Sequence, residues 1–305
     1  MNPSPSGDQF EITHGRQRAT IVEVGGGIRS FTDAERDVLQ PYAADAMCDG
    51  AHGAPLIPWP NRLGDGRYRF DGIDYQVALN EPEKANAIHG FLRWRSWRAV
   101  EHAADRVVMG TQLHPLEGYP FSLDVRVAYV LADDGLTVTT TARNTGAHAL
   151  PYGCGQHPYL SPGGDTTIDD CLLQFDASTR ITTDAQRQLP TGAEAVAGGE
   201  FDFSTPRPLG DLEIDYAFTD LARDAEGRAW VRLTGRDGRT VALWADEAYP
   251  LLELYTADTL SDSRRRKGLG SEPMTCPPNA FATGERVIRL EPGDSATASW
   301  GVRLI

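Results

Sequence analysis

Two segments in the second half of the chain carry side chains suited to acid–base chemistry. His157 stands in Gly155-Gln-His-Pro-Tyr159, where upstream glycines and the following proline constrain the backbone. Glu272 lies between a glycine-rich stretch and Pro273, on a second stiffened irregular segment. Because an imidazole exchanges protons near neutral pH and a carboxylate can accept one, these two residues can supply an acid and a base.

A group of polar residues nearer the N-terminus has the composition of a sugar-binding face. Asn61 and Arg62 are followed by His89, which stands in Asn86-Ala-Ile-His-Gly90. Such side chains supply the directional hydrogen bonds that hydroxyl groups require, and aromatics such as Trp59 can stack on the apolar C–H faces of a pyranose. Each also has an ordinary alternative: a solvated loop position for Arg62, a structural or surface role for His89, and the core for Trp59.

Three further features of the C-terminal half could contact a ligand. Asp215, among apolar residues, can accept hydrogen bonds from two sugar hydroxyls or merely cap a turn. Tyr255 can stack on a sugar ring, although aromatic residues of a β-rich chain more often belong to the core. The basic run Arg264-Arg-Arg-Lys267 has two interpretations as well, a solvated loop face or a clamp for a phosphate.

Several reaction and cofactor classes lack their sequence signatures. Glycoside hydrolysis needs two carboxylates across the scissile bond, and the sequence offers no obvious pair of that kind. A serine nucleophile elbow, a P-loop and a dinucleotide-binding glycine fingerprint are missing too. The cysteines are widely scattered without zinc-ligand spacing, so we expect mostly reduced thiols, no metal and no cofactor. They are Cys48, Cys154, Cys171 and Cys276.

The charge of the chain restricts its partners. The formal net charge is −14 and the sequence pI is about 4.9, which argues against a nucleic-acid or anionic-membrane partner, because both need basic protein surface. A neutral or weakly charged small molecule fits better. The N-terminal residues contain no apolar signal region and no run reaches a membrane-spanning length, so we expect cytoplasmic residence by default.

Alternating apolar residues predict strands along most of the chain. Residues 123–131 and 136–142 alternate on either side of Asp133-Asp-Gly135, which predicts a hairpin, and Asp237-Gly238 predicts another. Helical periodicity is scarce, although 33–45 could form a helical turn or two before Pro41 interrupts it. No linker divides the chain, so we expect one all-β domain over residues 1–305, built as a sandwich or barrel.

Taken together, the ordered motifs resemble those of the aldose 1-epimerase (galactose mutarotase-like) family. The resemblance implies a large antiparallel β-sandwich with an open sugar-binding cleft. It also implies cofactor-independent interconversion of the α and β anomers of a hexose. The matching motifs are Asn61-Arg62 with Gly66–Gly72, Asn86–Gly90, Gly155–Tyr159, Asp215–Phe218 and Glu272–Phe281.

The same resemblance implies a role for each candidate residue. His157 matches the general acid that protonates the ring oxygen, and Glu272 matches the base that removes the proton of the C1 hydroxyl. The ring then opens to the aldehyde, the C1–C2 bond rotates, and reclosure gives the other anomer. The residues expected to bind the sugar are Arg62, His89, Asp215, Asn61 and Tyr255.

Three other functions are open at this stage. A hexose-6-phosphate epimerase is one, because Arg264 to Lys267 could bind a phosphate. A non-catalytic carbohydrate-binding or sensor protein is another, although simple binding does not need both His157 and Glu272. A glycosidase or lyase is disfavoured by the missing second carboxylate. The sequence leaves the identity of the sugar and the oligomeric state open.

Overall fold

The regular structure of the chain consists almost entirely of antiparallel strands, and its largest sheet carries several residues of the site. The structure is a computed structural model that describes residues 4–305, so the first three residues of the N-terminal segment discussed above lie outside it. Twelve strands form this first sheet. Their order is β1 (Gln9–His14), β2 (Gln17–Val22), β3 (Ile28–Asp33), β4 (Arg36–Leu39), β16 (Tyr159–Leu160), β25 (Leu269–Met274), β24 (Leu251–Tyr255), β21 (Asp215–Leu221), β18 (Ala177–Thr183) and β19 (Pro190–Ala195), with β15 (Gly155–Gln156) pairing with β25 and with β5 (Pro55–Leu56).

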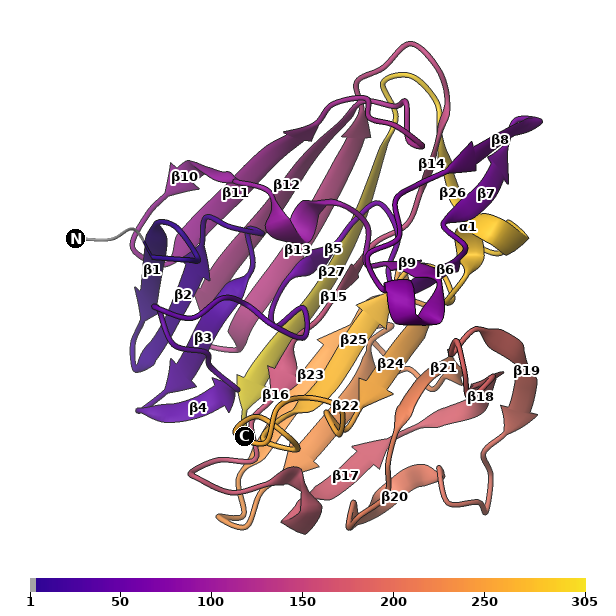
Figure 1. The fold of residues 1–305 in the computed structure, drawn as a ribbon. Helices are drawn as coiled ribbons and strands as arrows, with labels where there is room; N and C mark the ends of the chain where they lie inside the picture. The colour runs from indigo at the N-terminus through magenta and orange to yellow at the C-terminus, as the bar shows by residue number, and fades with distance from the viewer. Residues whose placement is uncertain (1–3) are drawn as a thin grey trace.

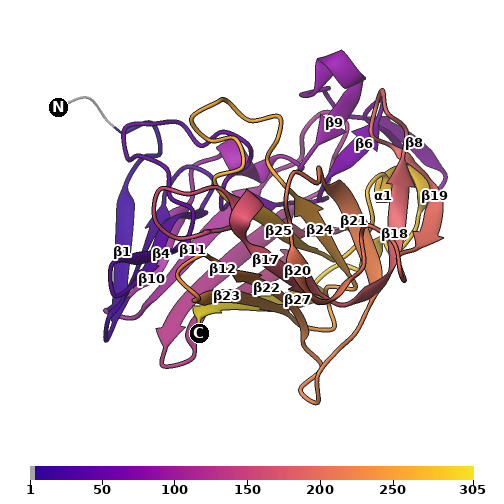
Figure 2. The same cartoon turned by 90° about the horizontal axis from the view of Figure 1, so that it is seen from below.

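A second sheet of nine strands lies against the first (Figures 1 and 2). Its order is β10 (Arg98–His102), β11 (Arg106–Leu113), β12 (Leu123–Ala132), β13 (Gly135–Asn144), β27 (Ser295–Leu304), β23 (Thr240–Ala245), β22 (Ala229–Thr234), β17 (Leu172–Phe175) and β20 (Phe203–Pro208).

Short elements complete the fold. Three strand pairs stand outside the large sheets: β14 (Leu150–Tyr152) with β26 (Ile288–Leu290), β6 (Arg62–Gly64) with β9 (Asn86–Ile88), and β7 (Arg67–Phe70) with β8 (Ile73–Gln76). The helices are single turns: η1 (Pro82–Lys84), η2 (Leu92–Trp94), η3 (Ile168–Asp170) and α1 (Ala280–Thr283). Across residues 4–305, no helix has the length and apolar character needed to cross a membrane.

The core lies between the two large sheets. Alternate residues of β12 are buried from Leu123 to Leu131, as the sequence pattern predicts for a strand with one face inward. They belong to one hydrophobic cluster that also contains Phe31 and Leu254 of the first sheet and Trp300 of the second. The expected all-β antiparallel sandwich is therefore confirmed.

The turns follow the sequence signals except in one place. Ala132 lies opposite Gly135, so Asp133 and Asp134 form the predicted two-residue connection between β12 and β13. The helical turn expected within 33–45 is wrong, because strand β4 occupies this segment and pairs with β3. Val38 and Leu39 gain burial in the core as strand residues, which outweighs the weak helical pattern.

Candidate active site

One cavity of about 470 Å³ brings together every residue that the sequence analysis placed in the site. Its volume lies in the range of small-molecule pockets. The predicted residues that line it are His157, Glu272, Arg62, His89, Asp215, Asn61 and Tyr255. The lining also includes residues that the sequence analysis did not single out as site residues, among them Glu81, Lys84, Arg93, Tyr159 and Gln188.

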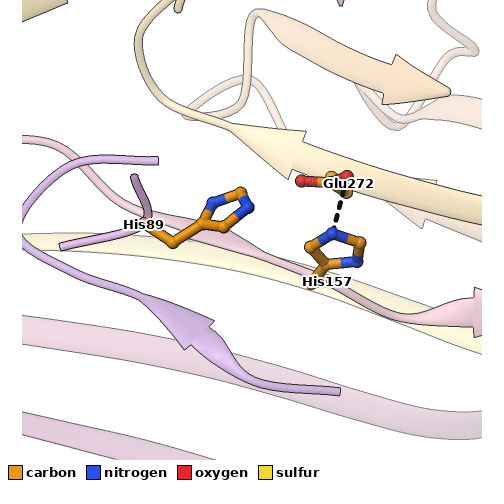
Figure 3. Close-up of side chains that lie close together, drawn as sticks. All are labelled: His89, His157 and Glu272. Carbon is orange, nitrogen blue, oxygen red and sulfur yellow. Dashed lines mark ion pairs between the residues drawn. The ribbon is translucent and has the colours of Figure 1, made fainter. Parts of the chain in front are cut away.

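His157 and Glu272 form a buried hydrogen-bonded pair in this cavity. Nε2 of His157 lies 3.0 Å from Oε1 of Glu272 (Figure 3). Nδ1 of the histidine and Oε2 of the glutamate are buried without a hydrogen-bond partner among residues 4–305. Unpartnered buried polar atoms are uncommon in folded proteins, so their presence here indicates a functional rather than a purely structural pair.

The backbone and neighbouring rings fix the position of His157 between β15 and β16. Its N–H donates to the carbonyl of Ala54 at 3.1 Å, and its carbonyl accepts from the N–H of Gly53 at 2.8 Å. Its ring stacks on Tyr159 with centroids 4.9 Å apart, and Tyr159 in turn stacks on His52 at 4.2 Å. Such packing restricts the ring to one orientation toward Glu272.

Burial shifts the proton affinities of the pair in opposite directions. Burial lowers the pKa of His157 to about 3, with the charges of His52 and Arg93 adding to the effect. Burial raises the pKa of Glu272 well above its usual value, and the neighbouring carboxyl of Glu253 raises it further. Both shifts favour the neutral form of each residue, so they favour a pair that holds one exchangeable proton across the 3.0 Å hydrogen bond.

His89 lies beside the pair and presents a neutral imidazole. Its Nδ1 accepts the backbone N–H of Asn61 at 3.1 Å, which leaves the ring proton on Nε2. Burial lowers its pKa well below the usual value, helped by the charge of His157. The following Gly90 has a φ of +63°, and a Cβ there would lie 2.0 Å from the carbonyl oxygen of Ile57, so only glycine allows this turn.

The same three residues have a spacing that could hold a metal ion. One ligand atom from each of His89, His157 and Glu272 lies within 4.8 Å of the others (Figure 3). Two imidazoles and a carboxylate with an open fourth position are ligands that zinc accepts. Metal binding would compete with the hydrogen bond between His157 and Glu272. The expectation of a metal-free site stays a prediction, and its test is given below.

Arg62 is the centre of a charged network on another wall of the cavity. Its Nε donates to Glu81 at 3.0 Å, and its Nη2 lies 3.8 Å from Oδ2 of Asp215. Glu81 also pairs with Lys84 at 3.3 Å and accepts a hydrogen bond from Asn86. Burial alone would lower the pKa of Arg62, but the carboxylates of Asp215 and Glu81 raise it. The guanidinium therefore stays charged and fixes both carboxylates.

Asp215 and Tyr255 face each other across β21 and β24, which are paired at this position. Gln188 donates a hydrogen bond to Asp215, and the hydroxyl of Tyr255 lies 2.6 Å from that of Thr259. Tyr255 is only partly buried, so its ring is not a core residue. Both side chains are therefore placed to contact a ligand in the cavity.

Glu253 is a buried neighbour of the site that the sequence analysis missed. It stands on β24 directly opposite Glu272 on β25, and only 2% of its surface is exposed. Burial raises its pKa well above the usual value, and the charge of Asp215 acts in the same direction, while a hydrogen bond with Asn61 lowers it. The signal available in the sequence is its spacing of two from Tyr255, which puts both side chains on one face of the strand.

The phosphate clamp considered for Arg264 to Lys267 is not formed. Arg264 pairs with Asp49, Lys267 pairs with Asp165, and none of the four residues lines the cavity. A solvated face is also wrong for Arg266, which is buried between Asp169 and Asp258. These ion pairs anchor the loop after β24.

Trp59 belongs to the core, which is the ordinary position considered for it from the sequence. It is 3% exposed and packs edge-on against Phe91, with ring centroids 4.8 Å apart. Stacking of this side chain on a sugar is therefore excluded by its position.

Comparison with known proteins places the chain in a family. A family model described as Aldose 1-epimerase matches residues 8–303. The uncharacterized protein YihR of Escherichia coli (strain K12) is 35% identical over 290 residues, covering 94% of this chain and 90% of that protein. Galactose mutarotase of Homo sapiens is 30% identical over 235 residues, covering 70% of this chain and 66% of that protein.

Solved structures show the same architecture. The GalM/aldose epimerase homologue from C. elegans superposes with a TM-score of 0.87 at 19% identity, and the match covers 98% of each chain. Similarity at this level of identity shows the fold alone.

Proposed function

Because the chain belongs to the aldose 1-epimerase family, we propose that it interconverts the α and β anomers of a hexose by opening and reclosing the sugar ring. The observation that carries the proposal is the 3.0 Å contact between His157 Nε2 and Glu272 Oε1 inside a cavity lined by polar side chains. The reaction needs one acid and one base close together, because both reacting oxygens are bonded to C1.

Ring opening proceeds from the form in which the shared proton is on His157. Glu272 accepts the proton of the C1 hydroxyl while the bond between C1 and the ring oxygen breaks. His157 gives its Nε2 proton to that ring oxygen, so the products are the open-chain aldehyde, a protonated Glu272 and a neutral His157. Concerted transfer avoids a free alkoxide, which a carboxylate is too weak a base to generate.

Reclosure reverses these proton movements on the other face of the aldehyde. After rotation about C1–C2, Glu272 returns its proton to the carbonyl oxygen as the C5 hydroxyl attacks C1 and gives its proton to His157. The number of protons on the pair is the same before and after turnover, so the enzyme needs no cofactor to reset it. The Arg62 network, His89 and Tyr255 hold the sugar meanwhile.

Anomer-resolved NMR on freshly dissolved α-sugars tests the proposal. We expect equilibration faster than in buffer for at least one hexose of a small panel. The matched variants are Glu272→Gln, which removes the base, and Glu200→Gln, which changes an exposed carboxylate outside the cavity. Sugar binding without any acceleration over buffer would instead identify a carbohydrate-binding or sensor protein.

The metal-free expectation is tested in the same assay. Protein dialysed exhaustively against a chelator should retain its full rate of anomer exchange. Loss of that rate, with recovery on adding one divalent metal, would show that His89, His157 and Glu272 bind a metal in the working enzyme.

A further inference from the structure

Arg93 is a cation of the cavity that the network described above leaves without a partner. It stands on η2 and lines the cavity. Within residues 4–305 its side chain forms no ion pair, and its Nε is buried without a hydrogen-bond partner. By contrast, the neighbouring lining cations Arg62 and Lys84 both pair with Glu81.

A guanidinium without an ion pair, on a half-buried side chain whose Nε is buried, is costly for the folded protein. Burial lowers the pKa of Arg93, whereas the carboxylates around Arg62 raise the pKa of that residue. A guanidinium nevertheless keeps its charge in proteins. One wall of the cavity therefore carries a positive charge that forms no ion pair, although the charge of Glu81 acts on it from a distance, and an anion bound there would lower the cost.

The charge of Arg93 acts on the histidine side of the cavity. It contributes to the lowered pKa of both His89 and His157. In the proposed reaction His157 faces the ring oxygen, and Glu272 faces the C1 hydroxyl. The ring oxygen is bonded to C5, which carries the exocyclic C6, so a substituent on C6 extends on the side of His157 away from Glu272.

We propose, building on the proposed anomer exchange, that Arg93 binds an oxyanion carried on C6 of the sugar, so that the preferred substrate is an anionic hexose. Its planar guanidinium can donate two parallel hydrogen bonds to the oxygens of a phosphate, a sulfonate or a carboxylate. The basic run at 264–267 does not take this role, because its side chains lie outside the cavity.

Binding of such an anion would also favour the acid form of His157. The positive charge of Arg93 disfavours a second positive charge on the imidazole. An oxyanion on the guanidinium neutralises that charge, so the shared proton moves more readily from Glu272 to His157. An anionic substrate therefore gains in turnover as well as in binding.

The test compares anomer exchange for four sugars: glucose, glucose 6-phosphate, glucuronate and glucose with a sulfonate on C6. We expect at least one anionic sugar to exceed glucose in kcat/KM by about 10–100-fold, which corresponds to a charged hydrogen bond. The anionic sugar with the highest kcat/KM identifies the preferred oxyanion. In Arg93→Met this preference ratio should fall by the same factor, whereas Arg95→Met, which changes a nearby exposed arginine, should leave it intact.

Failure of this inference and failure of the proposed function give different results. Equal acceleration of glucose and all anionic sugars, or an unchanged ratio in Arg93→Met, would overturn the role of Arg93 and leave anomer exchange standing. Acceleration of no sugar would overturn the proposed function. In that case, calorimetric measurement of sugar affinity still tests the role of Arg93. Anionic sugars that bind wild type no more tightly than glucose does would reject that role.

Discussion

Glu253 and Glu272 occupy directly opposed positions on the adjacent strands β24 and β25, with both carboxyl groups buried. Burial raises the pKa of each, and the charge of Glu253 raises that of Glu272 further. Two buried carboxylates at opposed positions of adjacent strands cannot both ionise without strong repulsion. The proton that acid–base catalysis needs is therefore kept in the site by a residue that does not itself line the cavity.

The first prediction concerns Glu253. Glu253→Gln keeps a neutral hydrogen-bonding group, so the protein should stay folded, whereas Glu253→Leu loses the contacts with Asn61 and Asp215 and should cost about 1–3 kcal/mol of unfolding free energy. Glu253→Gln also removes a charge that raises the pKa of Glu272. The alkaline limb of the rate profile should therefore move to lower pH, which a pH–rate titration measures. An unmoved limb would show that the two carboxyls are not coupled.

Stability should depend on pH through the same residue. A carboxyl whose pKa is raised by folding stabilises the protein below its unfolded pKa, and this contribution disappears as pH rises through the folded value. The free energy of unfolding of wild type should fall as pH rises from the unfolded pKa of about 4.5 through the folded value. Glu253→Gln should show a smaller fall in urea titrations at matched pH values.

The sequence predicts well which neighbouring strands form a hairpin. It predicts poorly which residues lie opposite each other on strands that are far apart along the chain. The β12–β13 hairpin follows from alternation around Asp133-Asp-Gly135 alone. The opposition of Glu253 and Glu272 depends instead on the register of two strands joined by the long segment 256–268, which no local pattern specifies. Arg93 escapes detection for a related reason, since the lack of a partner becomes visible only when the cavity is assembled.

The second prediction separates binding from folding in the Arg62 network. Asp215→Asn should weaken sugar affinity by about 10–100-fold, because it removes a charged hydrogen-bond acceptor from the cavity. Arg62→Met should lower stability as well, by about 1–3 kcal/mol, because the buried carboxylate of Glu81 loses its guanidinium partner, although Lys84 and Asn86 remain. The double variant with Glu81→Gln should recover much of that stability. Calorimetry and urea denaturation measure the two effects, and full affinity in both single variants would place the sugar elsewhere.

The third prediction is the pH dependence of turnover. The one-proton form of the pair persists between the lowered pKa of His157, about 3, and the raised pKa of Glu272. Below that range the pair takes up a second proton and loses its base, and above it the pair loses its acid. The rate of anomer exchange, corrected for buffer catalysis, should therefore not fall as pH drops through the ordinary histidine pKa near 6.5 toward about pH 5. A fall centred near pH 6.5 would contradict the opposite shifts of the pair.

The last prediction separates catalysis from binding at the pair itself. Glu272→Gln and His157→Asn each remove one proton-transfer group while the Arg62 network, His89 and Tyr255 continue to hold the sugar. Each should lose about 10²–10⁴-fold in kcat, the usual contribution of a general acid or base, with little change in affinity. The double variant should lose little more than the worse single variant, because the 3.0 Å pair acts as one unit. Glu200→Gln, at an exposed position, controls for the loss of one carboxylate charge. Exchange by Glu272→Gln at close to the wild-type rate would remove the base assignment from Glu272 and transfer it to Asp215, which lines the same cavity.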